Sequence, residues 1–461
     1  MDDVLVIGAG YTGLAAAYYL RKKNLKITLL EGRERVGGRT LDCLISGNKR
    51  LELGGQYITP SQKRVTELVA DLGLKTYQAW SKGNNFLFIN DKVSQFQTSP
   101  AQCLAEHLNQ PNVQQEIESA LKQLESLYSE VTEASPWKSP KAKDWDSFTF
   151  QSWIDCNIKS SAAKQFFRFM TNQGFSTEPE QISFLQMLWF FKTSHGLPSW
   201  ALGGAQANRV DGGTQLVAER LALKLEGIIK YDEKVISIEQ NDDEVQVITE
   251  NNAFRAKRVI VCIPPQLINA VQYYPPLPSD LFRAFSAFQV GNSMKVQAVY
   301  KKPFWRDRGF SGNGISFNGV PTFTYDNTSP AGKPGVLLGF LSATNATVWN
   351  DKPKEERISA VLRTWATVFG QDALYPKEYI EMDWMRESLT RGGHGAHFPP
   401  GVWAELGPAL GGDSMPHFGR VIWAASDLAK DWNGYLEGAL FAGEQAAQEV
   451  VEELSLQLTP N

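Results

Sequence analysis

The chain begins with a short aliphatic run that ends in closely spaced glycines. Residues 4–7 are all aliphatic, and Gly8, Gly10 and Gly13 follow them, with an alanine-rich stretch after the last glycine. The aliphatic run predicts a buried strand, and the alanine-rich stretch predicts a helix. A second aliphatic run ends in Glu31. A strand, a glycine turn, a helix and a second strand with a terminal acid together predict a βαβ unit that binds a dinucleotide.

Each position in this unit has its own physical role. Gly8 permits a tight turn, Gly10 lets the backbone approach a pyrophosphate, and Gly13 lets helix and strand pack closely. The free N–H groups at the helix N-terminus carry a partial positive charge that favours phosphate. Glu31 is expected to accept hydrogen bonds from ribose hydroxyls.

Helical and strand patterns then alternate along the chain. Apolar residues at helical spacing predict helices near 65–72 and over 114–131, with further helical segments rich in Phe, Met and Trp up to about residue 200. Apolar runs at 235–238 and 245–248 predict a hairpin, and the run at 258–263 predicts a buried parallel strand.

The last third of the chain adds two strands and a helix. Alternating residues over 294–300 predict one strand, and the apolar run at 421–425 predicts another. A final helix is expected from Tyr435 to about Leu454.

These patterns predict an α/β protein with two domains, since 461 residues are too many for one ordinary core. A Rossmann-like nucleotide-binding domain is expected to be built from the separated segments 1–75, 205–290 and 385–461. An α+β substrate-binding domain is expected from 76–204 and 291–384.

The composition argues against nucleic acid and metal ions as partners. With 43% hydrophobic and 21% charged residues and a net charge of −4, the chain is typical of a folded protein without the basic stripe that nucleic acid needs. The four cysteines lie far apart, which indicates free thiols, and the five histidines form no His-x-x-x-His pair, so no metal site is expected. Without a signal peptide or an apolar run of about 18 residues, we expect a soluble, cytoplasmic protein.

Five sequence blocks are spread over nearly the whole chain: 31–40 with 51–57, 136–138 with 145–146, 291–295 with 303–306, 398–401, and 432–439. In this order they resemble the flavin-containing amine oxidase family, the group of monoamine and polyamine oxidases. The resemblance implies FAD as the cofactor, with an amine and O2 as the small-molecule partners. It leaves the oligomeric state open.

The resemblance also implies a set of cofactor-binding residues. Gly54 and Gly55 are expected to let the chain pass close to the flavin, and the N-terminus of the final helix is expected to stabilise negative charge on it. Asp427 matches a position where the family usually has a glutamate. The full set is Gly8, Gly10, Gly13, Glu31, Arg33, Gly38, Arg39, Gly54, Gly55, Gln56, Val235, Trp384, Asp427, Tyr435 and Leu436.

Lys295, Tyr435 and Trp384 are the catalytic residues that the resemblance implies. Lys295 matches the family's lysine that holds a water beside the reactive nitrogen of the flavin. Tyr435 and Trp384, together with Trp432, are candidate walls of a dry aromatic cavity. Such a cavity lowers the pKa of an arriving ammonium, and aromatic faces attract the cation.

Three positions depart from the family's pattern. Gly395 stands where a second aromatic residue commonly faces the flavin, which is expected to widen the cavity unless Trp200 or His397 fills the gap. Ala425 replaces a glycine. His394 stands where some monoamine oxidases carry a cysteine bonded to the flavin. We favour non-covalent FAD, and a histidyl link stays open.

The predicted reaction is the oxidation of an amine to an imine, which hydrolyses to an aldehyde and an amine while O2 becomes H2O2. A polyamine such as spermidine or spermine is the favoured substrate, and a monoamine oxidase of broad specificity stays open. An L-amino-acid oxidase needs a cation for the substrate carboxylate. Arg168 and Arg391 are the candidates for that role, because no arginine closely follows Gly55. A flavin desaturase and a non-catalytic flavin carrier are the remaining rivals.

Overall fold

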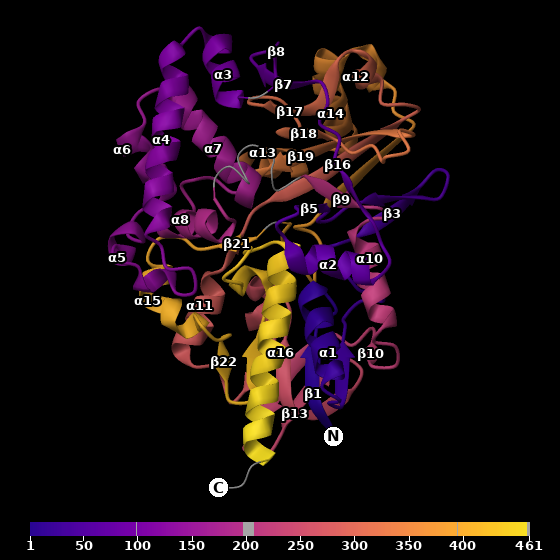
Figure 1. Ribbon diagram of the computed structural model, residues 1–461, viewed down its shortest axis with the longest axis vertical. Coiled ribbons are helices and arrows are strands. Elements are labelled where there is room, and N and C mark those ends of the chain that lie inside the picture. The colour runs from indigo at the N-terminus through magenta and orange to yellow at the C-terminus, as the bar shows by residue number, and fades with distance from the viewer. Residues whose placement is uncertain (98, 197–206, 394, 459–461) are drawn as a thin grey trace.

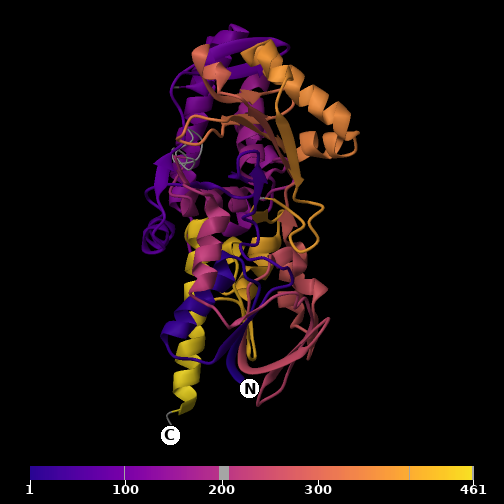
Figure 2. The same cartoon turned by 90° about the vertical axis from the view of Figure 1, so that its right-hand side faces the viewer.

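The computed structural model describes residues 1–97, 99–196, 207–393 and 395–458. Figure 1 shows two lobes stacked along the long axis: β1, α1 and α16 lie in the lower lobe, and the strands around β16–β19 lie in the upper one. The start of β1 and the far end of α16 lie at the same lower end in Figures 1 and 2.

Nine strands of the described chain form the sheet of the lower lobe. Strands β10, β2, β1, β13 and β23 are joined by parallel pairing, and the antiparallel hairpin of β11 and β12 extends the sheet from β13. The predicted hairpin and the predicted buried parallel strand are both confirmed. The bounds are Asp2–Ile7 (β1), Ile27–Leu30 (β2), Ile229–Lys230 (β10), Val235–Gln240 (β11), Val245–Thr249 (β12), Ala253–Val261 (β13), Gln272–Tyr274 (β14), His417–Phe418 (β22) and Val421–Trp423 (β23).

The first and last helices, α1 (Tyr11–Lys22) and α16 (Leu436–Leu458), pack against each other in the lower lobe. A Cβ atom on Gly443 would lie 2.1 Å from the backbone oxygen of Thr12, so this close contact requires a glycine. Helices α2 (Lys63–Asp71) and α10 (Thr214–Leu223) contact α16 and α1, respectively.

Seven strands of the described chain form the sheet of the upper lobe, in the order β20-β16-β19-β18-β17-β7-β8. The predicted strand over 294–300 is confirmed as β16, and all eight of its residues are buried between β19 and β20. Its polar residues Lys295 and Gln297 therefore face the interior instead of solvent. The bounds are Asn84–Ile89 (β7), Lys92–Phe96 (β8), Ser293–Tyr300 (β16), Phe310–Ser316 (β17), Phe323–Asp326 (β18), Gly335–Ser342 (β19) and Glu378–Asp383 (β20).

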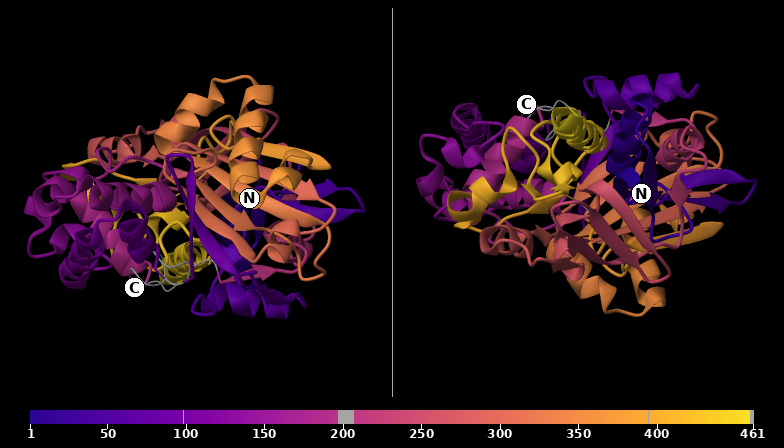
Figure 3. Two further views of the ribbon diagram at one scale, coloured as in Figure 1. Left: turned by 90° about the horizontal axis from the view of Figure 1, so that it is seen from above. Right: turned by 90° about the horizontal axis from the view of Figure 1, so that it is seen from below.

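A group of helices lies beside this upper sheet, as Figures 1 and 3 both show. The predicted helix over 114–131 is confirmed as α4. Stacked aromatic rings of Phe150, Trp153 and Phe184 join α6 to α8. The bounds are Pro100–Leu108 (α3), Pro111–Ser129 (α4), Ala142–Trp145 (α5), Phe150–Asn157 (α6), Ser161–Phe175 (α7) and Phe184–Thr193 (α8).

Short elements connect the two lobes. Three small sheets consist of Asp42–Ile45 (β3) with Lys49–Glu52 (β4), Tyr57–Ile58 (β5) and Thr76–Gln78 (β6) with Asn208–Val210 (β9), and Gln289–Val290 (β15) with Ala396–His397 (β21). The remaining α-helices are Ser279–Ala287 (α11), Phe304–Asp307 (α12), Ala343–Asn350 (α13), Lys354–Phe369 (α14) and Val402–Leu406 (α15).

Each large sheet draws its strands from separated parts of the chain. The lower sheet uses strands within 2–30, 229–274 and 417–423, and the upper sheet uses strands within 84–96, 293–342 and 378–383. The exact domain limits stay a prediction, and the limit at 204–205 lies outside the described residues. The four cysteines are free thiols. Among the helices of the described residues, none has both the length and the apolar character that crossing a bilayer requires.

One titratable side chain is buried without a polar partner. His397 on β21 is 1% exposed, its ring packs edge-on against Phe175 with centroids 5.7 Å apart, and neither ring nitrogen forms a hydrogen bond with a described residue. Burial lowers the pKa of His397 to about 4. The fold therefore holds this imidazole neutral where a free histidine would take up a proton.

We predict that His397→Phe makes the fold less sensitive to acid. The unfolded chain takes up a proton at this position near pH 6.5, but the folded chain does so only near the pKa of about 4. The histidine therefore costs no stability above pH 6.5, and it destabilises the fold increasingly as the pH falls from there. Between pH 7 and 5 the parent should lose about 2 kcal/mol more free energy of unfolding than the variant.

Urea unfolding followed by tryptophan fluorescence at pH 7, 6 and 5 measures this difference. His417→Phe, at an exposed position on β22, is the control. Parallel pH slopes for the parent and His397→Phe would contradict the prediction.

Candidate active site

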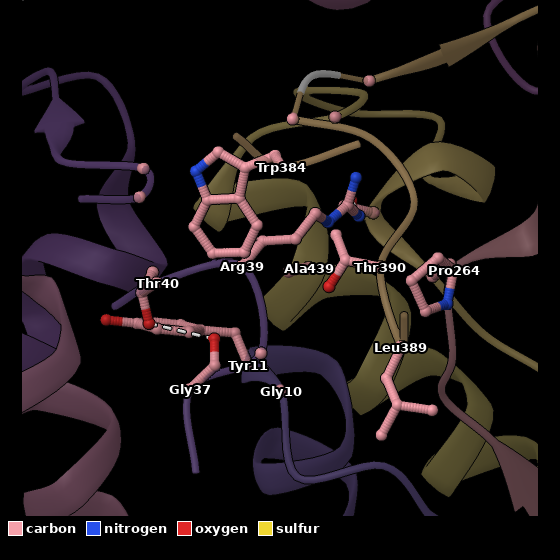
Figure 4. Close-up of a pocket in the computed structure, with 18 of the residues that line it drawn as sticks. Gly10, Tyr11, Gly37, Arg39, Thr40, Pro264, Trp384, Leu389, Thr390 and Ala439 are labelled. Atoms are coloured by element: carbon pink, nitrogen blue, oxygen red, sulfur yellow. Dashed lines mark hydrogen bonds between the residues drawn. The ribbon is translucent and has the colours of Figure 1, made fainter. Parts of the chain in front are cut away.

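A cavity of about 660 Å³ extends from the glycine turn after β1 to the inner face of the upper sheet. Its lining includes the start of α1, residues 37–40 and 53–57, and the segments that lead into α16. Figure 4 shows Gly10, Gly37 and Thr40 on one side of this cavity and Pro264, Leu389 and Thr390 on the other. The cavity therefore joins the predicted nucleotide site to the predicted substrate site.

The three glycines of the first turn serve different purposes. A Cβ atom on Gly8 would lie 2.7 Å from the backbone oxygen of Cys262, and one on Gly13 would lie 1.8 Å from the oxygen of Gly8. Both glycines are thus required by the packing of the protein itself. A Cβ atom on Gly10 would meet only the Cα of Gly38, 4.0 Å away, on the cavity side. Gly10 therefore leaves open space, a Cβ atom on Gly38 would lie 3.2 Å from the Cα of Gly10, and Gly13 does not line the cavity.

Glu31 and Arg33 line the nucleotide end, together with Val235. The buried carboxylate of Glu31 accepts hydrogen bonds from the N–H groups of Ala9 at 2.7 Å and Arg33 at 3.0 Å. Burial raises the pKa of Glu31. Two of its roughly four lone-pair sites are used, which leaves acceptor capacity for hydroxyl donors.

Arg33 has spare donor capacity in the same region. It is held by the Thr390 hydroxyl at 3.0 Å and by Glu387 at 3.1 Å, and its Nε atom is buried without a hydrogen-bond partner among the described residues. Because Arg33 lines the cavity, its guanidinium suits a ligand that carries acceptor oxygens.

Asp427 lies behind the cavity wall, where it fixes Arg39. Its carboxylate accepts from the Arg39 guanidinium at 2.6 Å and from the Ala396 N–H at 2.6 Å. Burial by itself would raise the pKa of Asp427, but Arg39 and the N–H group outweigh it and hold that pKa below its ordinary value. Arg39 lines the cavity. Ala425, which replaces a family glycine, has extended backbone angles that any residue adopts.

Lys295 on β16 lines the end of the cavity at the upper sheet, and its side chain is buried. Its Nζ donates to the Gly54 carbonyl at 2.9 Å and to the side-chain oxygen of Gln56. The pKa of Lys295 is lowered to about 7, chiefly by burial; Arg209 also lowers it, and Glu52 and Asp42 oppose the shift. At neutral pH a substantial fraction of this amine is therefore unprotonated.

The paired glycines beside Lys295 also differ from each other. A Cβ atom on Gly54 would lie 2.1 Å from the backbone oxygen of Arg39, so Gly54 is required by a neighbouring chain segment. A Cβ atom on Gly55 would meet nothing within 4 Å, and Gly55 lines the cavity. The indole of Trp384 also lines it and donates to the Leu53 carbonyl at 2.9 Å.

Tyr435 and Leu436 line the cavity where α16 begins. The Tyr435 ring lies nearly parallel to Phe190, with centroids 6.4 Å apart, and Trp432 contacts the edge of Tyr435 from outside the cavity lining. Trp432 therefore supports Tyr435 and does not itself form the wall.

The gap at Gly395 is not filled by His397, which is not among the cavity-lining residues. A Cβ atom on Gly395 would make ordinary contacts of 3.6–3.8 Å with Gly434 and Asp427. The other candidate for the gap, Trp200, and the candidate flavin-linking residue His394 both lie outside the described residues.

The two arginines proposed for an amino-acid carboxylate are placed differently. Arg168 forms ion pairs with Glu178 at 2.6 Å and with Glu180, and it does not line the cavity. Arg391 lines the cavity, next to Thr390 near the nucleotide end.

Most of the aromatic lining of the cavity was not predicted from the sequence. The described lining also contains Gln173 and Phe175 at the end of α7, Phe190 on α8, and Phe323, Tyr325 and Phe340 on the upper sheet. The aromatic content of 160–200 was visible in the sequence, but helical spacing does not separate a cavity wall from an ordinary core.

Comparisons with known proteins agree with this geometry. The sequence model of the family described as flavin-containing amine oxidoreductase matches residues 11–451. A protein of Dictyostelium discoideum named as a probable flavin-containing monoamine oxidase A is 31% identical, over 98% of both chains. The flavin-containing amine oxidase B of Mus musculus is 32% identical, over 98% of this chain and 86% of the mouse protein.

Solved structures match as well. The cyclohexylamine oxidase of Brevibacterium oxydans superposes with a TM-score of 0.91 at 28% identity, over 98% of this chain and 99% of that one. A putrescine oxidase bound to putrescine gives a TM-score of 0.91 at 29% identity, with the same coverage. By its sequence match, its relatives and its fold, this chain belongs to the flavin-containing amine oxidoreductases.

Proposed function

We propose that this protein binds FAD non-covalently and oxidises an apolar monoamine, with O2 as the electron acceptor. The observation that carries the proposal is the continuous cavity that joins a glycine-lined nucleotide end to an aromatic end containing the buried Lys295. Membership of a flavin-containing amine oxidoreductase family supports the general reaction.

The residues of the cavity suit FAD. Glu31 has acceptor capacity for ribose hydroxyls, and Arg33, Arg39 and the uncapped N-terminus of α1 suit the pyrophosphate. The start of α16 offers free N–H groups where negative charge is best stabilised. When bound, FAD supplies the two-electron acceptor that amino-acid side chains lack. The chain's own contribution is to orient the amine, exclude water and move a proton.

Lys295 and the aromatic wall prepare the amine. An alkyl amine arrives as a cation, since its pKa is near that of lysine, about 10. The ring faces of Tyr435 and Phe190 attract this cation, and the apolar surroundings favour its neutral form. The Nζ of Lys295 in its neutral form can accept the proton that the amine loses, directly or through one water.

The charge distribution of the cavity favours a monoamine over a polyamine. Among the described residues that line it, the only acids are Glu31 and Glu233, which lie at the nucleotide end. The chain segments outside the description, including 197–206, contain neither Asp nor Glu. A second ammonium group of a polyamine would therefore have no anionic partner beside the aromatic wall.

The polyamine stays the second candidate. Gly395 lines the cavity and has no side chain to fill it, which favours a longer molecule, and one of the similar solved structures holds putrescine. An L-amino-acid substrate is less well supported, because Arg168 is held by two glutamates away from the cavity.

We predict that acid precipitation of the purified yellow protein leaves FAD in the supernatant. The reason is that His394 stands where some monoamine oxidases carry a cysteine bonded to the flavin, so this chain cannot form that thioether. Absorbance spectra of pellet and supernatant near 450 nm provide the measurement, with free FAD added to a denatured unrelated protein as the control. A yellow pellet after repeated washing would demonstrate a covalent link instead.

We expect peroxide release to be fastest with apolar monoamines. In a panel of cyclohexylamine, phenylethylamine, putrescine, spermidine and two L-amino acids, kcat/KM for the better monoamine should exceed that for spermidine by at least about tenfold, because burying a second ammonium unpaired costs more than 1.4 kcal/mol. A peroxidase-coupled assay measures the rates, and an artificial electron acceptor is included for activity without O2. Spermidine as the best substrate would restore the polyamine assignment.

We expect Lys295→Met to slow amine oxidation or O2 consumption by at least about 100-fold, as removal of a general base does, while FAD stays bound. Stopped-flow absorbance of the anaerobic and the aerobic half-reactions separates the two steps. Lys301→Met, at the exposed residue just beyond the same strand, is the matched control. Parent-like rates in both half-reactions would remove Lys295 from the mechanism.

A further inference from the structure

We propose that Gln56, Asn327 and Gln297 form a one-way chain of side-chain amides that positions Lys295 and directs its proton exchange toward the cavity. No contact among these three side chains was expected from the sequence. The inference deepens the proposed function, because it rests on the role given there to Lys295.

The direction of the amide chain is set at its end farthest from Lys295. The backbone carbonyl of Glu52 can only accept, and the amide nitrogen of Gln297 donates to it at 2.8 Å. The Gln297 oxygen then accepts from the Asn327 amide nitrogen at 2.6 Å, and the Asn327 oxygen accepts from the Gln56 nitrogen at 2.7 Å. Only the oxygen of Gln56 remains to face the Nζ of Lys295.

Burial prevents any of the three amides from reversing its orientation. Gln56, Asn327 and Gln297 are each at most 3% exposed, so water does not replace a partner that turns the wrong way. Reversing any one amide would place two donors or two acceptors against each other, at the cost of an unsatisfied buried group. Gln56 precedes β5, Asn327 directly follows β18 and Gln297 lies on β16, so the amide chain joins both lobes.

The fixed orientation of Gln56 determines which contacts the Lys295 Nζ makes with the protein. Its Nζ meets two protein acceptors, the Gly54 carbonyl and the Gln56 oxygen. A neutral amine has two N–H groups, which these acceptors use, so its lone pair is left for the cavity. An ammonium has a third N–H group, which occupies that same position. Both protonation states therefore keep the same contacts with the protein and differ only on the cavity side.

Charged groups around Lys295 determine the relative stability of its neutral and protonated forms. Glu52 forms a buried ion pair with Arg209 at 2.6 Å, and Arg209 also donates to the backbone carbonyl of Asn327 at 2.9 Å. Glu52, Asp42 and Cys43 favour the ammonium, while Arg209 opposes it. On the neighbouring strands, the residues paired with Lys295 are the uncharged Phe340 and Met382.

The test measures the pKa of Lys295 directly in the FAD-loaded protein. Lysine labelled with ¹³C at Cε is followed by NMR from pH 6 to 10, and the Lys295→Met variant identifies the signal. Gln56→Leu removes an acceptor that the ammonium needs more than the amine does, so the pKa should fall by about one unit. Gln56→Glu places a carboxylate there, so the pKa should rise by at least about one unit.

Asn327→Leu tests the chain beyond direct contact with Lys295. It releases the Gln56 amide from its fixed direction, and the pKa of Lys295 should fall by about half a unit. Gln186→Leu is the matched control, because Gln186 is a buried glutamine on α8 outside the cavity lining that accepts from Trp403, and its loss should leave the pKa unchanged.

The proposal would be overturned if Gln56→Leu and Gln56→Glu shifted the pKa of Lys295 in the same direction, or if neither variant shifted it. A parent-like pKa in Asn327→Leu would reduce the chain to a single contact and overturn it as well. The readout does not depend on turnover. If Lys295→Met were fully active, the proposed function of Lys295 would fail while the NMR titration still decided the amide chain.

Discussion

The structure around the cavity depends on how four consecutive backbone carbonyls are held. The carbonyls of Glu52, Leu53, Gly54 and Gly55 accept from Gln297, Trp384, Lys295 and Thr214, respectively. Three of these donors come from the upper lobe, and Thr214 begins α10 in the lower lobe. The segment 52–55 is therefore fixed from both sides, and with it the position of Lys295 relative to the nucleotide end.

The Glu52–Arg209 ion pair anchors this segment. The Glu52 carboxylate accepts from the Arg209 guanidinium at 2.6 Å and from the Thr214 N–H at 3.0 Å, with both side chains nearly inaccessible to water. Burying two charges costs several kcal/mol per ion, which only close pairing and full hydrogen bonding offset. The pair is thus better understood as a device that fixes one arrangement of the lobes than as a source of net stability.

Much of the lower lobe could be predicted because its signals are local. The aliphatic runs, the glycine spacing and Glu31 define a βαβ unit within about 30 residues, and β1, α1 and β2 form as expected. The strand containing Lys295 was equally readable, but alternation alone suggests that its polar residues face solvent. They face a buried network, because residues far away in the sequence supply their partners.

The aromatic cavity lining and the amide chain could not be predicted from the sequence for the same reason. Asn327 follows a strand with no recognisable motif, and its side-chain amide bonds to residues 30 and 271 positions away. Gly10 and Gly13 look alike in the sequence, yet only the structure separates the glycine that leaves room for a ligand from the one that packs against the protein. Phe175 and Phe190 likewise resemble core residues until the cavity beside them is seen.

The contact between the first and last helices has a consequence for how this protein matures. Helix α1 packs on α16 through Gly443, and β23 pairs with β13 only after residue 420 has been made. A nascent chain that is still missing these residues has no closed pocket for its cofactor, however well its N-terminal βαβ unit has folded. Because residues within 425–439 line the cavity together with residues within 7–12, the complete cavity forms only when the last helix has packed against the first.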